Sequence, residues 1–82
     1  MEVLRSAFRH GITTKDMLHA VNNALTVEEV AEEPLRYLIS GPDTAGNMLE
    51  LVIPDRGQGP ALIHAMPIRA RYRPLLPGGP RP

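Results

Sequence analysis

A chain of 82 residues with a formal net charge of zero is long enough for one small domain and too short for two. It has no cysteine, which excludes disulfide bonds and thiolate metal sites and fits a reducing compartment. Because a domain of this size buries only about 60% of its unfolded surface, a homo- or hetero-oligomer is expected to help stabilise it. The N-terminus lacks the apolar core of a signal peptide and no apolar stretch is long enough to span a bilayer, so we predict a soluble, cytoplasmic protein.

Charge is distributed unevenly along the chain. Residues 27–55 contain seven acidic residues and one basic residue, Arg36, whereas residues 56–82 contain five arginines and no acid. A guanidinium group suits recognition of phosphate or carboxylate better than the point charge of lysine does. A genome rich in G and C would explain the preference for arginine over lysine, but not this segregation. The acid-free segment Ile63–Arg73 is therefore the first place to look for a site.

Two short helices joined by a tight turn are predicted at the N-terminus. In residues 3–8 the apolar side chains recur at helical spacing, and Gly11 favours a left-handed turn that ends the first helix. Thr13 is predicted to cap the second helix, with Asp16 three residues later in a capping-box position. The apolar stripe of this second helix continues to Leu25.

A run of strands is predicted next. Residues 26–30 favour a short strand, but the glutamates among and after them indicate an exposed edge or a loop. Residues 35–40, 48–53 and 60–66 are predicted strands separated by two glycine-containing loops. Short connections between consecutive strands predict an antiparallel meander.

The helical pattern returns weakly after Pro67 and is broken by Pro74, so only a turn or two of helix is expected there. We therefore predict an α+β fold, with two N-terminal helices packed on a three- to four-stranded antiparallel sheet and a short basic C-terminal helix. One domain is expected over residues 1–76. The proline- and glycine-rich tail, residues 77–82, is expected to be disordered.

Candidate catalytic side chains lie on two of the strands and in the basic segment. Pairing of these strands could bring Glu50 and His64 together, although the sequence does not set the register. A histidine, a carboxylate, arginines and a tyrosine suffice for RNA cleavage without a metal: a base takes the 2′-hydroxyl proton, arginines stabilise the phosphorane, and an acid protonates the leaving oxygen. Each residue also has an ordinary structural interpretation, in packing, hydrogen bonding or solvation. No metal or cofactor motif is present. The predicted catalytic residues are His64, Glu50, Arg69, Arg71 and Tyr72.

A family resemblance rests on five short motifs in order along the chain. They are Arg-His-Gly-Ile-Thr at 9–13, Arg-Tyr-Leu-Ile-Ser-Gly at 36–41, the glycine-led apolar run at 46–52, Leu-Ile-His-Ala-Met at 62–66, and the arginine–tyrosine cluster at 69–72. In this order they resemble the BrnT-like toxins of the RelE/ParE-type superfamily, over most of residues 5–76.

The resemblance implies a bacterial toxin that cleaves RNA and is neutralised by a small DNA-binding antitoxin encoded beside it. It implies functional positions at Arg9, His10, Arg36, Arg69, Arg71 and Tyr72. We assign RNA binding to Arg9, His10, Arg36 and Arg73. Two alternatives stay open: a non-catalytic protein-interaction module that uses the exposed sheet edge and the basic helix, and a gyrase-targeting toxin, since the same superfamily includes such members.

Overall fold

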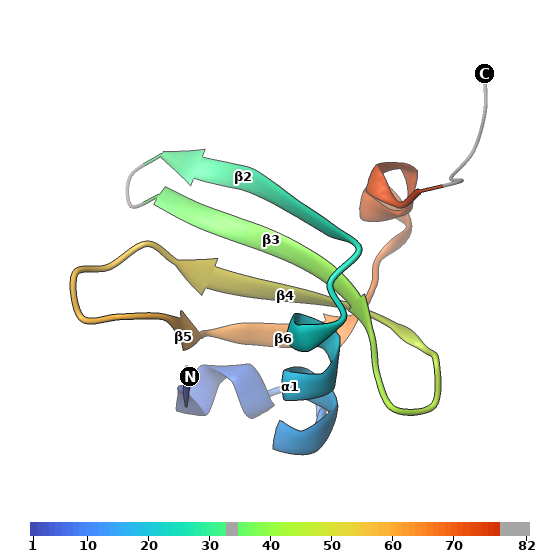
Figure 1. Ribbon diagram of the computed structural model, residues 1–82, viewed down its shortest axis with the longest axis horizontal. Helices are drawn as coiled ribbons and strands as arrows, with labels where there is room; N and C mark the ends of the chain where they lie inside the picture. Colours follow the sequence, from blue (N-terminus) through green and yellow to red (C-terminus); the bar gives the residue numbers. More distant parts are fainter. Residues whose placement is uncertain (33–34, 78–82) are drawn as a thin grey trace.

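The computed structural model describes residues 1–32 and 35–77 of the chain. Within these residues, an antiparallel sheet of four strands has the order β2–β3–β4–β6. One α-helix of the described chain, α1, lies against one face of this sheet (Figure 1). The strands are β2 (Thr26–Glu32), β3 (Leu35–Pro42), β4 (Met48–Pro54) and β6 (His64–Pro67), and α1 spans Thr14–Asn22. The predicted tail falls largely on residues 78–82, which lie outside the described residues.

The prediction of two N-terminal helices is wrong. The first segment instead forms a two-residue strand, β1 (Glu2–Val3), and a single 3₁₀ turn, η1 (Arg5–Phe8). β1 pairs in parallel with β5 (Ala61–Leu62), which makes a second, two-stranded sheet. The apolar residues of this segment have helical spacing, but they form a single 3₁₀ turn that packs along β6 (Figure 1).

Tertiary hydrogen bonds explain why this segment is not a helix. The Leu4 amide donates to the Leu62 carbonyl at 2.9 Å, and the Ser6 hydroxyl donates to the Ile63 carbonyl at 2.6 Å. Gly11 then turns the chain with a φ of +78°, the left-handed conformation that its sequence position predicted. The segment between the Leu4 hydrogen bond and the Gly11 turn is too short for a stable helix, because helix nucleation is unfavourable.

The second predicted helix forms, and its start is as expected. The Asp16 amide donates to the Thr13 hydroxyl at 3.2 Å, which confirms Thr13 as the N-cap. α1 ends at Asn22, earlier than the apolar stripe suggested, because the Leu25 amide already donates to the Ser40 carbonyl at 2.7 Å and the chain has joined the sheet.

The predicted strand over residues 60–66 is interrupted at Ile63. Its first half, β5, pairs with β1, and its second half, β6, pairs with β4. The break changes the side-chain alternation, so Leu62 lies in the apolar core and not on the face that carries His64.

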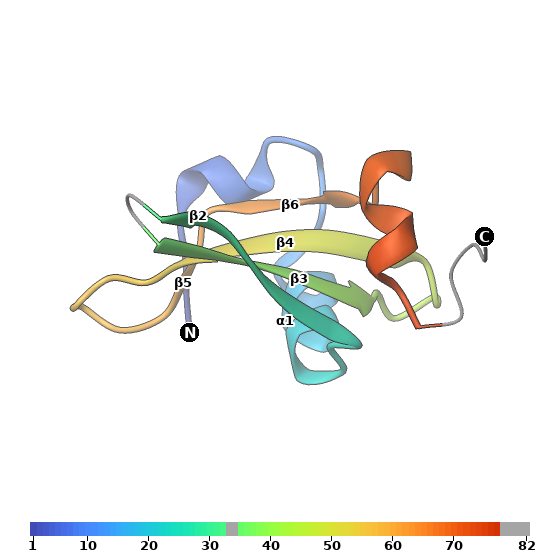
Figure 2. The same cartoon turned by 90° about the horizontal axis from the view of Figure 1, so that it is seen from above.

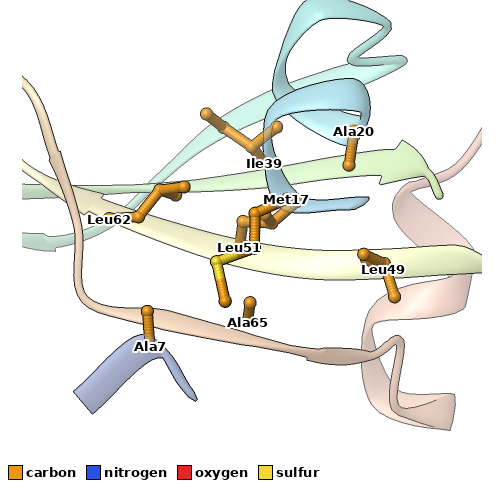
Figure 3. Packing of buried hydrophobic residues seen from close by; sticks show 8 residues of the cluster. All are labelled: Ala7, Met17, Ala20, Ile39, Leu49, Leu51, Leu62 and Ala65. Atoms are coloured by element: carbon orange, nitrogen blue, oxygen red, sulfur yellow. The ribbon is translucent and has the colours of Figure 1, made fainter. Parts of the chain in front are cut away.

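The main core lies between α1 and the sheet (Figure 3). The buried members are Ala7, Met17, Ala20, Ile39, Leu49, Leu51, Leu62 and Ala65. α1 lies close to β3 at Gly41, where an added Cβ atom would collide with the carbonyl oxygen of Ala20 and lie 2.9 Å from its carbonyl carbon. Only glycine allows so close an approach of the two backbones at this position.

The opposite face of the sheet carries the polar residues. Leu38, Ser40 and Glu50 are buried there, outside the main core cluster. Thr26, Ser40, Glu50 and Met66 follow one another across the strands as paired positions. After β6 the chain forms the 3₁₀ helix η2 (Ala70–Leu75), and Figure 2 shows α1 on one side of the sheet and η2 at its right-hand end. Among the described residues, no helix has the length and apolar character needed to cross a membrane.

Candidate functional site

A buried carboxylate is the centre of the candidate site. Glu50 lies in the middle of β4 and is 0% exposed, although glutamate is rarely buried unless it is paired. One of its oxygens, Oε1, lies 3.0 Å from His64 Nε2 and 2.8 Å from Arg69 Nε. The other oxygen, Oε2, accepts the backbone N–H of Arg69 at 3.1 Å. The prediction that Glu50 and His64 come together is confirmed. They meet because β4 and β6 pair in a register that sets Glu50 opposite Met66 and Val52 opposite His64.

These contacts keep Glu50 ionised. Burial is the strongest single influence on the pKa of Glu50 and raises it, but the hydrogen bonds from the Arg69 side chain, the Arg69 backbone and His64 together lower it below its ordinary value. A side chain with no exposed surface cannot touch a substrate. Glu50 therefore serves to hold His64 and Arg69, and the two outer residues are the ones that meet solvent.

His64 is oriented by this carboxylate. Its side chain is 26% exposed, and its Nε2 faces Glu50. A carboxylate can only accept, so the hydrogen of a neutral His64 ring resides on Nε2 and the Nδ1 lone pair is left free. This is the arrangement in which a carboxylate fixes the tautomer of a histidine base.

Arg69 is fixed at the start of η2. The preceding residue, Ile68, is buried, and its amide donates to the Met48 carbonyl at 3.0 Å, which ties the chain to the end of β4. The Arg69 guanidinium approaches Glu50 Oε1 through Nη2 at 2.7 Å while the side chain stays 43% exposed. The hydrogen bond to Glu50 raises the pKa of Arg69. Its outer edge is therefore a permanently charged surface beside His64.

Tyr72 lies one turn farther on and is held by both neighbouring arginines. The guanidinium carbon of Arg71 is 4.7 Å from the Tyr72 ring centroid, and that of Arg69 is 5.3 Å away. Arg71 Nη2 also donates to the Tyr72 hydroxyl at 2.8 Å. The five predicted catalytic residues thus form one connected group, which runs from Glu50 outward to Arg71.

A second histidine lies beside this group. The ring of His10 meets the ring of His64 edge to face, with centroids 5.6 Å apart and planes inclined at 79°. The sequence placed His10 among the RNA-binding residues and gave no sign of this contact. The two histidines are far apart in sequence, and only the packing of η1 along β6 brings them together.

The other predicted RNA-binding residues are more dispersed. Arg9 is exposed next to His10, and Arg73 is exposed on η2. Arg36 is exposed on the same sheet face as Glu50, but it is four residues from Ser40, the β3 residue that pairs with Glu50, a displacement of about 13 Å along the strand. Arg36 is therefore separate from the group around Glu50.

The outer members of the group, His64 and Arg69, have side chains that are 26% and 43% exposed. A hollow of about 300 Å³ exists elsewhere, and none of the predicted site residues lines it; its lining is Tyr37, Ile53, Pro54, Asp55, Arg56, Gly59 and Pro60. Within residues 1–32 and 35–77, no three histidine, aspartate or glutamate side chains gather as a metal site would require. The chemistry that the described residues offer is acid–base catalysis by imidazole beside fixed positive charge.

Comparisons with known proteins add no identification. No family model matches this chain, nor does any curated protein or any solved structure.

Proposed function

We propose that this protein is a metal-independent endoribonuclease and the toxin of a bacterial toxin–antitoxin pair, active in the cytoplasm. The observation that carries the proposal is that His64 and Arg69 converge on one buried carboxylate, that of Glu50. This carboxylate is buried and has lost its hydration, and it fixes a partly exposed histidine and a partly exposed arginine side by side. Such an arrangement suits a residue that positions reactive groups.

Each group has a part in RNA cleavage. Nδ1 of His64 takes the proton of a 2′-hydroxyl, which then attacks the adjacent phosphorus. The outer edges of Arg69 and Arg71 stabilise the negative charge that grows on the phosphorane oxygens. Tyr72, between the two guanidinium groups, lines the same surface and offers its ring to a nucleobase.

The toxin role and its partner are supported by the resemblance in sequence to the BrnT-like toxins. By that resemblance, the partner is a small DNA-binding antitoxin encoded by a neighbouring gene. The acid-free arginine segment 63–73 supports a polyanionic target, and RNA is the one that an imidazole base can cleave through its own 2′-hydroxyl.

Purified protein tests the enzymatic part directly. A 5′-labelled RNA is incubated with wild type in the presence of EDTA, and products carrying a cyclic phosphate are expected. His64→Ala should lower the rate by about 10² to 10⁴, the usual contribution of a general base. Lys15→Ala, an exposed change on α1, is the matched control and should cleave as wild type does. Wild-type protein that leaves RNA intact would show that the activity is not ribonucleolytic.

Expression in a bacterium tests the toxin part. Induction of the wild-type gene alone should arrest growth and degrade RNA, whereas co-expression of the neighbouring gene should restore growth. Arg71→Ala is the preferred variant for relieving the arrest, because Arg71 makes no contact with the buried carboxylate. Arrest with intact RNA and a DNA-damage response would point to gyrase as the target.

One observation favours a second candidate, a protein-interaction module. β2 is the outer strand of the sheet at one edge, and its Val27 and Val30 side chains are 58% and 45% exposed. Exposed apolar residues on an edge strand favour pairing with another chain. Tight binding of the neighbouring gene's product by a protein that cleaves no RNA and arrests no growth would support the module alone.

A further inference from the structure

We propose that His10 is the general acid of the reaction, the partner of the His64 base. This assignment rests on the proposed ribonuclease function and gives His10 a direct chemical step in place of the RNA-binding role assigned to it on the family resemblance.

His10 is held in place although it lies in a loop. The turn before it is anchored by the hydrogen bond from the Ser6 hydroxyl to the Ile63 carbonyl, one residue before His64. The turn after it is fixed by Gly11, whose amide donates to the Phe8 carbonyl at 3.1 Å and whose φ is +78°. The His10 ring is therefore presented to the His64 ring by a closed turn, at a centroid separation of 5.6 Å.

Exposure and charge suit His10 to donating a proton. His10 is exposed, so water can reprotonate it after each turnover. Charged or titratable groups close to His10 include His64, whose ring it contacts, and Arg9, its neighbour in the chain, while Glu50 and Arg69 are joined to the other side of this pair through His64 and the Glu50 carboxylate. The Glu50 carboxylate is hydrogen-bonded to His64 and Arg69, and it fixes the tautomer in which His64 can act as the base. The proton donor to the leaving oxygen is then His10.

Two imidazoles with ring centroids 5.6 Å apart can both reach one phosphodiester bound over them, one at the attacking oxygen and one at the leaving oxygen. His64 Nδ1 accepts the 2′-hydroxyl proton as the 2′-oxygen forms its bond to phosphorus. The bond from phosphorus to the 5′-oxygen breaks, and His10 gives its proton to that leaving oxygen. The products are a 2′,3′-cyclic phosphate and a free 5′-hydroxyl, with His64 protonated and His10 neutral, and exchange with water restores both.

A substrate with a good leaving group separates the acid from the base. Uridine 3′-(4-nitrophenyl phosphate) reacts by the same 2′-attack but expels a phenolate that needs no proton. His10→Ala is expected to lower RNA cleavage by about 10² to 10⁴ and to leave release of 4-nitrophenolate within a few-fold of wild type. His64→Ala is expected to lower both rates. Imidazole added to His10→Ala should restore part of the RNA cleavage and leave the aryl substrate unaffected.

The controls keep the two proposals distinct. Lys15→Ala should match wild type on both substrates, and circular dichroism should show that each histidine variant keeps its fold. If wild type cleaves neither substrate, the ribonuclease function fails and this assignment fails with it. If wild type is active but His10→Ala loses both rates equally, or neither, the function stands and His10 is not the acid.

Discussion

Replacement of the buried carboxylate, Glu50→Gln, is the most direct test of how the site is built. The wild-type Glu50 carboxylate, which has no exposed surface, accepts three hydrogen bonds and makes a further ion-pair contact, all with His64 and Arg69. A glutamine of the same shape keeps one acceptor oxygen and turns an N–H₂ group toward donors. Each charge-assisted hydrogen bond contributes about 1.5–3 kcal/mol, and part of the loss is offset because an amide costs less to bury than a charge. We expect a net loss of about 2 kcal/mol at pH 7.

This loss should depend on pH in a defined direction. Burial raises the pKa of Glu50, but the hydrogen bonds from Arg69 and His64 together lower it by more. The pKa of Glu50 therefore lies below its ordinary value of 4.5. The ionised carboxylate therefore contributes stability that is fully present above the unfolded-state pKa and is lost as the pH falls through the lower, folded-state pKa. Glutamine does not titrate and makes no such pH-dependent contribution to stability. The difference in unfolding free energy between wild type and Glu50→Gln should therefore become smaller below pH 4.5.

Urea unfolding followed by far-ultraviolet circular dichroism measures both effects. Unfolding free energies are compared at pH 7 and at the lowest pH at which wild type is folded. A thermal scan at pH 7 should show a melting temperature roughly 10 °C lower for the variant. Glu28→Gln, which removes an exposed carboxylate from β2, is the control and should change little. The reasoning is refuted if Glu50→Gln is as stable as wild type at pH 7, or if the gap is the same at both pH values.

Three further changes test other parts of the fold. Gly41→Ala should cost about 3 kcal/mol, because its Cβ would lie 2.9 Å from a carbonyl carbon of α1, whereas Gly57→Ala has open space and should cost under about 1 kcal/mol; urea midpoints compare the two. Thr44→Val removes a 2.6 Å hydrogen bond to Asp16, the main cause of that residue's lowered pKa, so carbon-13 titration should show the Asp16 pKa rise toward 3.8. Ser40→Ala removes a buried hydroxyl that has no hydrogen-bond partner in the described structure and should leave the unfolding free energy unchanged or raise it; a loss above about 1 kcal/mol would contradict this.

Local chemistry allowed several features to be predicted from the sequence. Thr13 caps α1 because a hydroxyl at that position can accept from the amide three residues on, and Gly11 turns the chain because only glycine adopts a positive φ at no cost. The central strands were predicted because β-branched and apolar residues were separated by turn residues. The meeting of Glu50 and His64 followed from side-chain alternation once the strands were assumed to pair.

Tertiary structure decided the rest. The first apolar segment has helical spacing, but the hydrogen bonds of Leu4 and Ser6 to the β5–β6 connection hold it as a turn. The same connection breaks the predicted strand at Ile63.

The same distinction between sequence and tertiary structure applies to the candidate site. The sequence by itself determined the chemical groups of the site, because the acid-free arginine segment and its histidine are properties of the chain. Only the tertiary structure determined that the carboxylate is buried as a support and that His10 meets His64, because both depend on which distant segments pack together.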